Sequence, residues 1–171
     1  MGRDHACAVA RDGFAVCWGA DAYGRLSPPN DTLTAVTVGS RHSCGLRADG
    51  TAVCWGSDPY RDLSPPPGTF TEVLTGGNWV CGLRTDGTIA CSGQSYDEDI
   101  VSPEGTFSTL GTCGERSCAV RADGAIVCWS TEVHTWPAPP EVRYSQVSGG
   151  RNSICGVTIG GIVDCRGRAA R

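Results

Sequence analysis

Apolar and small residues occupy both odd and even positions of residues 44–56, which read CGLRADGTAVCWG. Asp49-Gly50 lies at the centre, and a glycine in the left-handed conformation is a favoured third residue of a three-residue hairpin loop. Counting outward from the loop gives four opposed pairs: Arg47 with Thr51, Leu46 with Ala52, Gly45 with Val53, and Cys44 with Cys54. The segment therefore predicts a β-hairpin.

The predicted register separates the hairpin into two faces. One face carries Cys44, Leu46, Ala52 and Cys54, and the other carries Gly45, Val53 and Trp55. We expect the small Gly45 to leave room for the indole of Trp55. Strands of a sandwich alternate apolar and polar residues, whereas these strands are apolar on both faces. The small sheet is therefore predicted to be covered on both sides.

The hairpin recurs five times with a step of 37 residues, which is typical of a repeat architecture. Other apolar positions keep the same step, among them Leu33, Phe70, Phe107 and Tyr144. Only four complete linking segments separate the five hairpins. We therefore predict one repeat domain over residues 1–171, with incomplete terminal repeats and hairpin units at 7–17, 44–54, 81–91, 118–128 and 155–165.

The cysteine spacing favours disulfides within the hairpins. Opposed cysteines at a non-hydrogen-bonded pair have Cα atoms about 4.5 Å apart, which a disulfide tolerates. Zinc sites, the alternative, usually place cysteines two to four residues apart, and here the members of a pair are ten apart. The predicted bonds are Cys7–Cys17, Cys44–Cys54, Cys81–Cys91, Cys118–Cys128 and Cys155–Cys165.

Five disulfides indicate an oxidising compartment, so a secreted or an extracellular or periplasmic location is expected. The sequence shows no signal peptide, and we interpret it as a mature region or a fragment. Eleven cysteines leave at least one without a partner in the chain. That cysteine is predicted to be Cys113, unpaired or linking two chains. A bond from Cys113 to Cys118, leaving Cys128 free, is the open alternative.

The repeat length favours a β-propeller. Thirty-seven residues accommodate about four short strands with their turns, and stacked propeller blades bury both faces of each sheet. The further strands are expected at residues 70–74 and, more weakly, at residues 62–64. Proline-rich joints, such as Pro65-Pro66-Pro67, lie where strand pairing should stop. The predicted fold is all-β, a propeller or propeller segment of about five blades with one hairpin disulfide per blade.

The pattern V-x-x-G-x-x-H-x-C-G-L-R-x-D-G-T-x-x-C-W-G at residues 36–56 resembles the repeat of the regulator of chromosome condensation family. It is most similar to the bacterial, cysteine-paired branch of that family. The resemblance implies β-propeller blades, typically seven to a closed ring, that act as rigid protein-binding surfaces. Members of the family include a nucleotide-exchange factor for a small GTPase and a secreted inhibitor of β-lactamases. The repeats depart from the pattern at Ser92, Arg166, Trp79, Arg116 and Ser153, so no family binding residue is transferred.

Charge and motifs exclude several classes of function. The net charge is -4, and the 14 basic residues, all arginine, are scattered, which argues against a nucleic-acid partner. No apolar run approaches the ~18 residues of a membrane span. We find no nucleophile, metal or phosphate motif, so a non-enzymatic protein without cofactor or metal is predicted. His5 and His42 share one repeat position and are interpreted as structural, and Asp97-Glu98-Asp99 as a solvated loop rather than a calcium site.

Arg47, Arg84 and Arg121 recur beside the Asp-Gly turns. We favour local pairing of these side chains over an anion-binding site. The expected partners lie two residues further along the chain: Asp49, Asp86 and Asp123.

Residues that differ between repeats are the candidates for a binding surface. Tracing the strands places the turn before each first cysteine and the loop after each Trp-Gly at the same end of the blades, here called the rim. Tyrosine, tryptophan and arginine are enriched at interface hot spots. The predicted rim residues are Tyr60, Arg61, Trp79, Tyr96, Asp97, Arg116, His134 and Trp136, accompanied by Tyr23 and Asp58.

The rim predicts a secreted scaffold that binds a protein partner. A structural, self-associating propeller segment completed by other copies or domains is the alternative, favoured by the incomplete terminal repeats. An enzyme inhibitor similar to the β-lactamase-inhibiting propellers is the second alternative.

Overall fold

The computed structural model describes residues 4–56, 64–95, 98–113, 116–129, 133–135, 141–149 and 153–167, with only the backbone of residues 95, 98, 113, 133–135 and 167. Within these ranges the chain forms β-strands and turns and no helix. The strands group into five blades, numbered one to five in chain order. The all-β propeller fold predicted from the repeats is thereby confirmed.

The blades use the strands in sequence order. The first blade contains β1 (His5–Val9) and β2 (Ala15–Gly19). The second contains β3 (Leu33–Val38), β4 (His42–Arg47) and β5 (Ala52–Gly56). The third contains β6 (Phe70–Thr75), β7 (Asn78–Arg84), β8 (Ile89–Ser95) and β9 (Glu98–Asp99). The fourth contains β10 (Phe107–Cys113), β11 (Arg116–Arg121), β12 (Ile126–Trp129) and β13 (Val133–Thr135). The fifth contains β14 (Tyr144–Gly149), β15 (Ser153–Thr158) and β16 (Val163–Gly167).

The predicted hairpin register is confirmed in every blade. Cys44 lies opposite Cys54 and Leu46 opposite Ala52, as counted from the loop. Gly50 has a φ of +83°, and the four equivalent glycines also have positive φ. The five predicted disulfides form, with Cα–Cα distances of 4.0–4.1 Å, somewhat shorter than the expected separation. The Asp-Gly turn and the ten-residue cysteine spacing therefore set the same register.

Gly45 leaves room for the side chain of Leu33, and not for the indole of Trp55 as we expected. A Cβ atom at Gly45 would overlap the side chain of Leu33, which comes from the neighbouring strand β3. The same relation holds in the third blade, where a Cβ at Gly82 would overlap the ring of Phe70. The glycine thus makes room for the large residue that begins the strand before the hairpin; we call this strand the inner strand of the blade (β3, β6, β10 and β14 in the second to fifth blades). The indole of Trp55 instead donates its Nε1–H to the Arg25 carbonyl at 3.1 Å.

Each inner strand contains a β-bulge that sequence reasoning missed. The register shifts between Leu33 and Ala35, and the residue between them, Thr34, donates its hydroxyl to the Leu46 carbonyl at 3.1 Å. A serine or threonine makes the equivalent bond in the next three blades: Thr71 to Leu83, Ser108 to Val120, and Ser145 to Val157, at 3.2–3.3 Å. The hydroxyl satisfies a carbonyl that the bulge removes from the ladder.

All described blades stack in the same orientation, so that the same two kinds of face meet at each junction. We call the side of a hairpin with the disulfide its cysteine face, and the other side, which carries Trp18, Trp55 or Trp129 in three blades, its tryptophan face. One core cluster joins Cys81 and Leu83 on the cysteine face of the third blade to Ala119 and Trp129 on the tryptophan face of the fourth. A second cluster joins the cysteine face of the fourth blade to Tyr144 of the fifth. In the second, third and fourth blades this stacking buries both faces of the sheet, as predicted.

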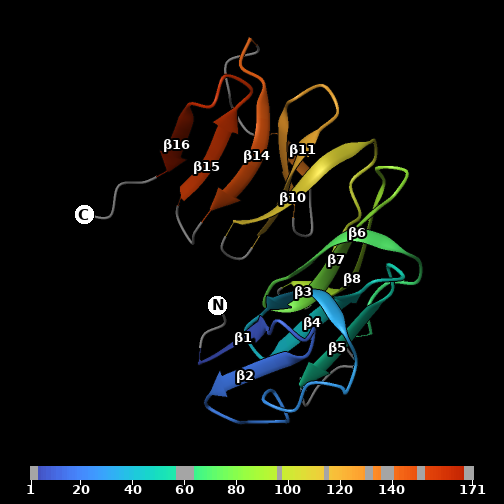
Figure 1. Cartoon of the computed structure of the whole chain (residues 1–171). Coiled ribbons are helices and arrows are strands. Elements are labelled where there is room, and N and C mark those ends of the chain that lie inside the picture. The colour runs from blue at the N-terminus through green and yellow to red at the C-terminus, as the bar shows by residue number, and fades with distance from the viewer. Residues whose placement is uncertain are drawn as a thin grey trace.

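The five blades follow one another along an open arc, from β1 and β2 at the blue end to β15 and β16 at the red end (Figure 1). Inner strands of neighbouring blades approach closely, as where β10 pairs in parallel with β14 through Cys113 and Gly149. The Ser40 amide donates to the Gly76 carbonyl at 3.2 Å between the second and third blades. Of the weak strand expected at residues 62–64, only Ser64 is described, and it is not in a strand.

Candidate interaction surface

The strand register defines the rim. In the second blade His42 lies opposite Gly56, so the turn before the first cysteine and the start of the Trp-Gly loop meet at one end. A Cβ atom at Gly56 would lie 2.9 Å from the Arg41 carbonyl, and Gly93 is similarly close to Asn78 and Trp79. These glycines have φ values of +87° and +98°. In the second and third blades the chain can therefore pass directly over the preceding turn only because Gly56 and Gly93 lack a side chain.

Two of the predicted rim residues have described side chains that are exposed. Arg116 begins β11 and is exposed. Tyr23, in the linker after the first blade, is 58% exposed and has a φ of +67°. An exposed arginine and tyrosine suit a protein interface, because both residue types are enriched at hot spots.

Trp79 does not belong to the accessible rim and is corrected to a core residue. Its side chain is 1% exposed and packs in the cluster between the third and fourth blades. The ring lies over Gly76, where a Cβ atom would overlap it. A tryptophan at this repeat position is buried because the glycine three residues earlier leaves space beneath the strand.

The other predicted rim residues lie outside the described side chains. The backbone of His134 is in β13, opposite Cys128. The remaining predicted residues fall wholly in undescribed segments: Asp58, Tyr60, Arg61, Tyr96, Asp97 and Trp136. The rim as a set of residues therefore stays a prediction.

In the first two blades, buried histidines occupy the repeat position of Trp79. Their burial agrees with the structural role predicted for them. His42 is 0% exposed and His5 is 4% exposed. His5 Nε2 hydrogen-bonds with Ser43 Oγ at 3.0 Å and so joins the first blade to the second. Burial, followed by the nearby Arg25 charge, holds the pKa of His5 below its ordinary value.

Arg25 is a buried residue that sequence reasoning missed. It is 6% exposed and donates from Nε to the Ala22 carbonyl at 2.8 Å. Its Nη1 atom lies 3.8 Å from Asp4 Oδ2. The equivalent positions in later repeats hold other residue types, so the repeat pattern carries no signal for it. Arg25 fixes the linker of the first blade against the indole of Trp55.

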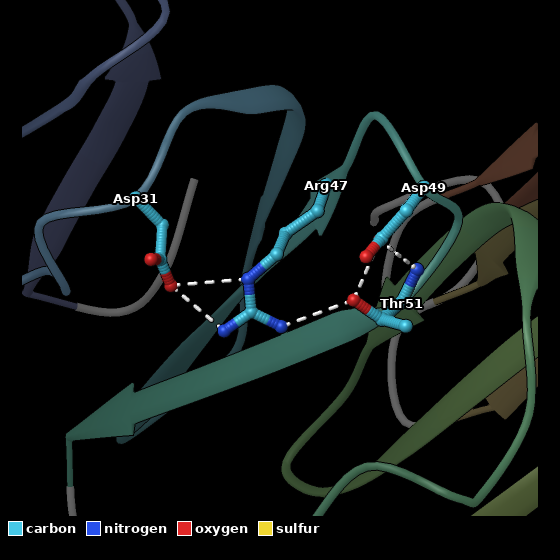
Figure 2. Close-up of polar contacts among 4 residues, drawn as sticks. All are labelled: Asp31, Arg47, Asp49 and Thr51. Carbon is cyan, nitrogen blue, oxygen red and sulfur yellow. Dashed lines mark hydrogen bonds and ion pairs between the residues drawn. The ribbon is translucent and has the colours of Figure 1, made fainter.

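The Asp-Gly turns lie at the opposite end of the blades. Asp49 Oδ1 accepts hydrogen bonds from the Thr51 amide at 2.9 Å and the Thr51 hydroxyl at 2.7 Å. Figure 2 shows that Arg47 points away from Asp49 and binds Asp31, with Nη2–Oδ2 at 2.7 Å, while Nη1 donates to Thr51. The expected pairing of Arg47 with Asp49 is wrong, because the Arg47 guanidinium binds Asp31 and Thr51 instead.

The third and fourth turns differ from each other. Arg121 does pair with Asp123, as expected, through Nε at 3.0 Å and also through Nη2. The Arg121 hydrogen bonds, together with the Ala125 amide, lower the pKa of Asp123 to about 2. Arg84 instead donates to Thr88 and lies over the Phe70 ring, 5.9 Å from its centroid. The repeated arginines thus differ in their contacts: Arg121 pairs within its own turn, whereas Arg47 and Arg84 also contact Asp31 and Phe70 outside their turns.

Neither a group of metal-ligating side chains nor a helix able to cross a membrane occurs in the described part of the chain. No three or more histidine, cysteine, aspartate or glutamate side chains in these ranges are grouped to hold a metal ion. No helix in the same ranges has the length and apolar character needed to cross a bilayer.

Residues 33–61 match the family described as Regulator of chromosome condensation (RCC1) repeat. No match was found among the curated protein sequences. The matched stretch includes the hairpin of the second blade and the turn before it.

The fold is similar to that of several solved propellers. The ectodomain of the Physcomitrella patens receptor kinase CR4 is 26% identical with a TM-score of 0.76, and the match covers 99% of this chain and 49% of that one. The CRINKLY WD40 ectodomain of the Arabidopsis thaliana receptor kinase ACR4 is 24% identical with a TM-score of 0.74, covering 98% and 61%. Yeast RCC1 (Prp20), in its crystal structure with Kap60, is 13% identical with a TM-score of 0.71, covering 96% and 54%.

The chain thus spans between about half and three fifths of the length of the solved structures that it resembles. The repeat match and the propeller neighbours confirm the resemblance carried by residues 36–56. Residues 33–61 thus match a repeat of the regulator of chromosome condensation type, and the described chain folds into five propeller blades, each with one hairpin disulfide.

Proposed function

We propose that this chain is a non-catalytic extracellular scaffold whose rim binds a protein partner. The observation that carries the proposal is the division of the central blades into a repeated, buried framework and an end whose residues vary between repeats. Framework residues such as Cys81, Leu83 and Trp129 are at most 4% exposed, so they cannot contact a partner. Arg116 is exposed at the rim in the fourth blade. The five disulfides and the receptor ectodomains among the similar structures support the extracellular location.

Physical reasons favour a rigid recognition surface. A disulfide in each hairpin and a close-packed interface between blades make the described framework rigid. Binding then requires little ordering of this framework, which lowers the entropic cost of association. The inhibitor alternative stays a prediction, because no described contact identifies an enzyme as the partner.

Matched arginine variants test the proposal. The immobilised, disulfide-intact chain is exposed to an extracellular protein extract, and bound proteins are identified by mass spectrometry. Arg116→Ala, combined with the predicted rim changes Tyr60→Ala and Tyr96→Ala, should abolish enrichment of the partner without lowering the melting temperature. Arg11→Ala is the control, because Arg11 is exposed in the first Asp-Gly turn at the opposite end. Equal enrichment by all variants would contradict binding through the rim.

A further inference from the structure

The two ends of the arc expose the two halves of the interface that joins blades within the chain. Inside the arc, the cysteine face of one blade packs against the tryptophan face of the next. Cys7 Sγ lies 3.5 Å from Ser43 Oγ between the first two blades, and Cys81 Sγ lies 3.7 Å from Ser117 Oγ between the third and fourth. The core clusters between later blades follow the same sense.

The first blade exposes its tryptophan face. Trp18 is 52% exposed, whereas the equivalent Trp55 and Trp129 are 7% and 0% exposed. Val16 on the same face is 54% exposed, compared with 4% for the equivalent Val127. These side chains keep the apolar character of a blade interface although no preceding blade covers them in this structure.

The fifth blade exposes its cysteine face. Val163 is 64% exposed, whereas Ile89 and Ile126 at the equivalent position are 4% and 2% exposed. Cys165 is also exposed, in contrast to Cys128 at 3%. Ile162, next to Val163, is 70% exposed and adds apolar surface at the end of the hairpin.

We propose that the exposed cysteine face of the fifth blade binds the exposed tryptophan face of the first blade of a second copy of this chain. The same pair of faces already meets at each junction inside the arc, so the contact between copies continues that series. The two surfaces are different, so the contact is head-to-tail and leaves one free face of each kind after every addition. This association is independent of binding at the rim.

The area of the two faces determines the affinity that we expect for the contact between two copies. The smaller face, that of the first blade, has two strands of five residues. Two such strands cover about 17 Å by about 10 Å, which is smaller than a standard stable interface. The contact should therefore be weak and concentration-dependent. Burial of apolar side chains drives it, so high salt should not dissociate the assembly.

Sedimentation velocity of the disulfide-intact chain, from low micromolar to millimolar concentration, tests the proposal. The weight-average sedimentation coefficient should rise with concentration. Trp18→Asp and Val163→Asp should each weaken self-association about tenfold or more, because either change places a charge in the apolar contact. Both positions are exposed, so the variants should keep the far-UV circular dichroism of the original chain.

Mixing the two variants distinguishes head-to-tail from like-with-like pairing. Trp18→Asp keeps an unaltered fifth blade, and Val163→Asp keeps an unaltered first blade. An equimolar mixture should recover association through one intact contact and stop at a heterodimer. Tyr23→Asn is the control, since Tyr23 is 58% exposed but lies in a linker, and asparagine tolerates its positive φ. A monomeric chain at every concentration, or a mixture that stays monomeric, would overturn the proposal.

Discussion

At the scale of single residues, the repeat position of Gly39, Gly76 and Cys113 determines whether the side chain three residues later can be buried. Gly39 and Gly76 each precede a buried ring by three residues, and an added Cβ would lie 2.8 Å from His42 Cε1 in one case and overlap the Trp79 ring in the other. In the fourth blade the ring is replaced by the exposed Arg116. Cys113, rather than glycine, occupies the earlier position there. At Gly76 the glycine is therefore required by the ring that folds back over it, whereas at Gly39 an added Cβ would also overlap the Gly76 carbonyl oxygen.

Gly76→Ala tests this requirement. The added methyl group must displace the Trp79 ring from the cluster between the third and fourth blades, so we expect a loss of about 1–3 kcal/mol in the free energy of unfolding. Urea unfolding followed by tryptophan fluorescence measures it. Gly77→Ala is the matched control, because a Cβ there meets no atom within 4 Å. Equal midpoints for the two variants would show that the ring does not need the glycine.

His5 gives the junction of the first two blades a pH dependence. Its folded-state pKa is lowered from 6.5 by burial and then by Arg25, with Asp4 acting in the opposite direction. As the pH falls below 6.5 the unfolded chain binds the proton first, so stability is lost. We expect the urea midpoint to fall between pH 7.5 and pH 5.5. His5→Gln should reduce that fall; an unchanged pH dependence would exclude His5 as its source.

At the scale of elements, the Asp-Gly turn and the cysteine spacing predicted the hairpins because both depend on local geometry. The bulge on each inner strand was not predicted, although a hydroxyl residue follows Leu33, Phe70, Phe107 and Tyr144 in every linking segment. A hydroxyl on a strand is common, so only its bond to the opposite carbonyl reveals the role. The 37-residue spacing of these hydroxyl residues was the sequence signal from which the bulge could have been predicted.

Thr71→Val tests the bulge. The change keeps the shape of the side chain and removes the hydroxyl that donates to the Leu83 carbonyl at 3.2 Å. We expect about 1 kcal/mol of destabilisation in urea unfolding, because the carbonyl loses its partner. Thr69→Val, at an exposed position two residues earlier, is the control and should cost much less. A smaller loss for Thr71→Val than for Thr69→Val would argue against the bond.

At the scale of the whole molecule, the 37-residue step predicted stacked blades because every repeat needs a neighbour to cover its two apolar faces. The repeats could not identify which side chains reach the surface. Trp79 was assigned to the rim by its residue type, yet it is buried by a contact with the next blade. Arg25 has no repeated equivalent and was missed for that reason. Exposure at a rim depends on packing between blades, which a single repeat does not encode.

The measurement that tests the disulfide-closed scaffold most directly is the intact mass of the denatured, unreduced chain after alkylation. Ten cysteines in five hairpin disulfides leave one of the eleven for the reagent. We predict a single label at the monomer mass, placed on Cys113 by peptide mapping. A label on Cys128 would contradict the pairing in the fourth blade. Labels on ten or eleven cysteines would contradict the disulfide scaffold and the extracellular location inferred from it.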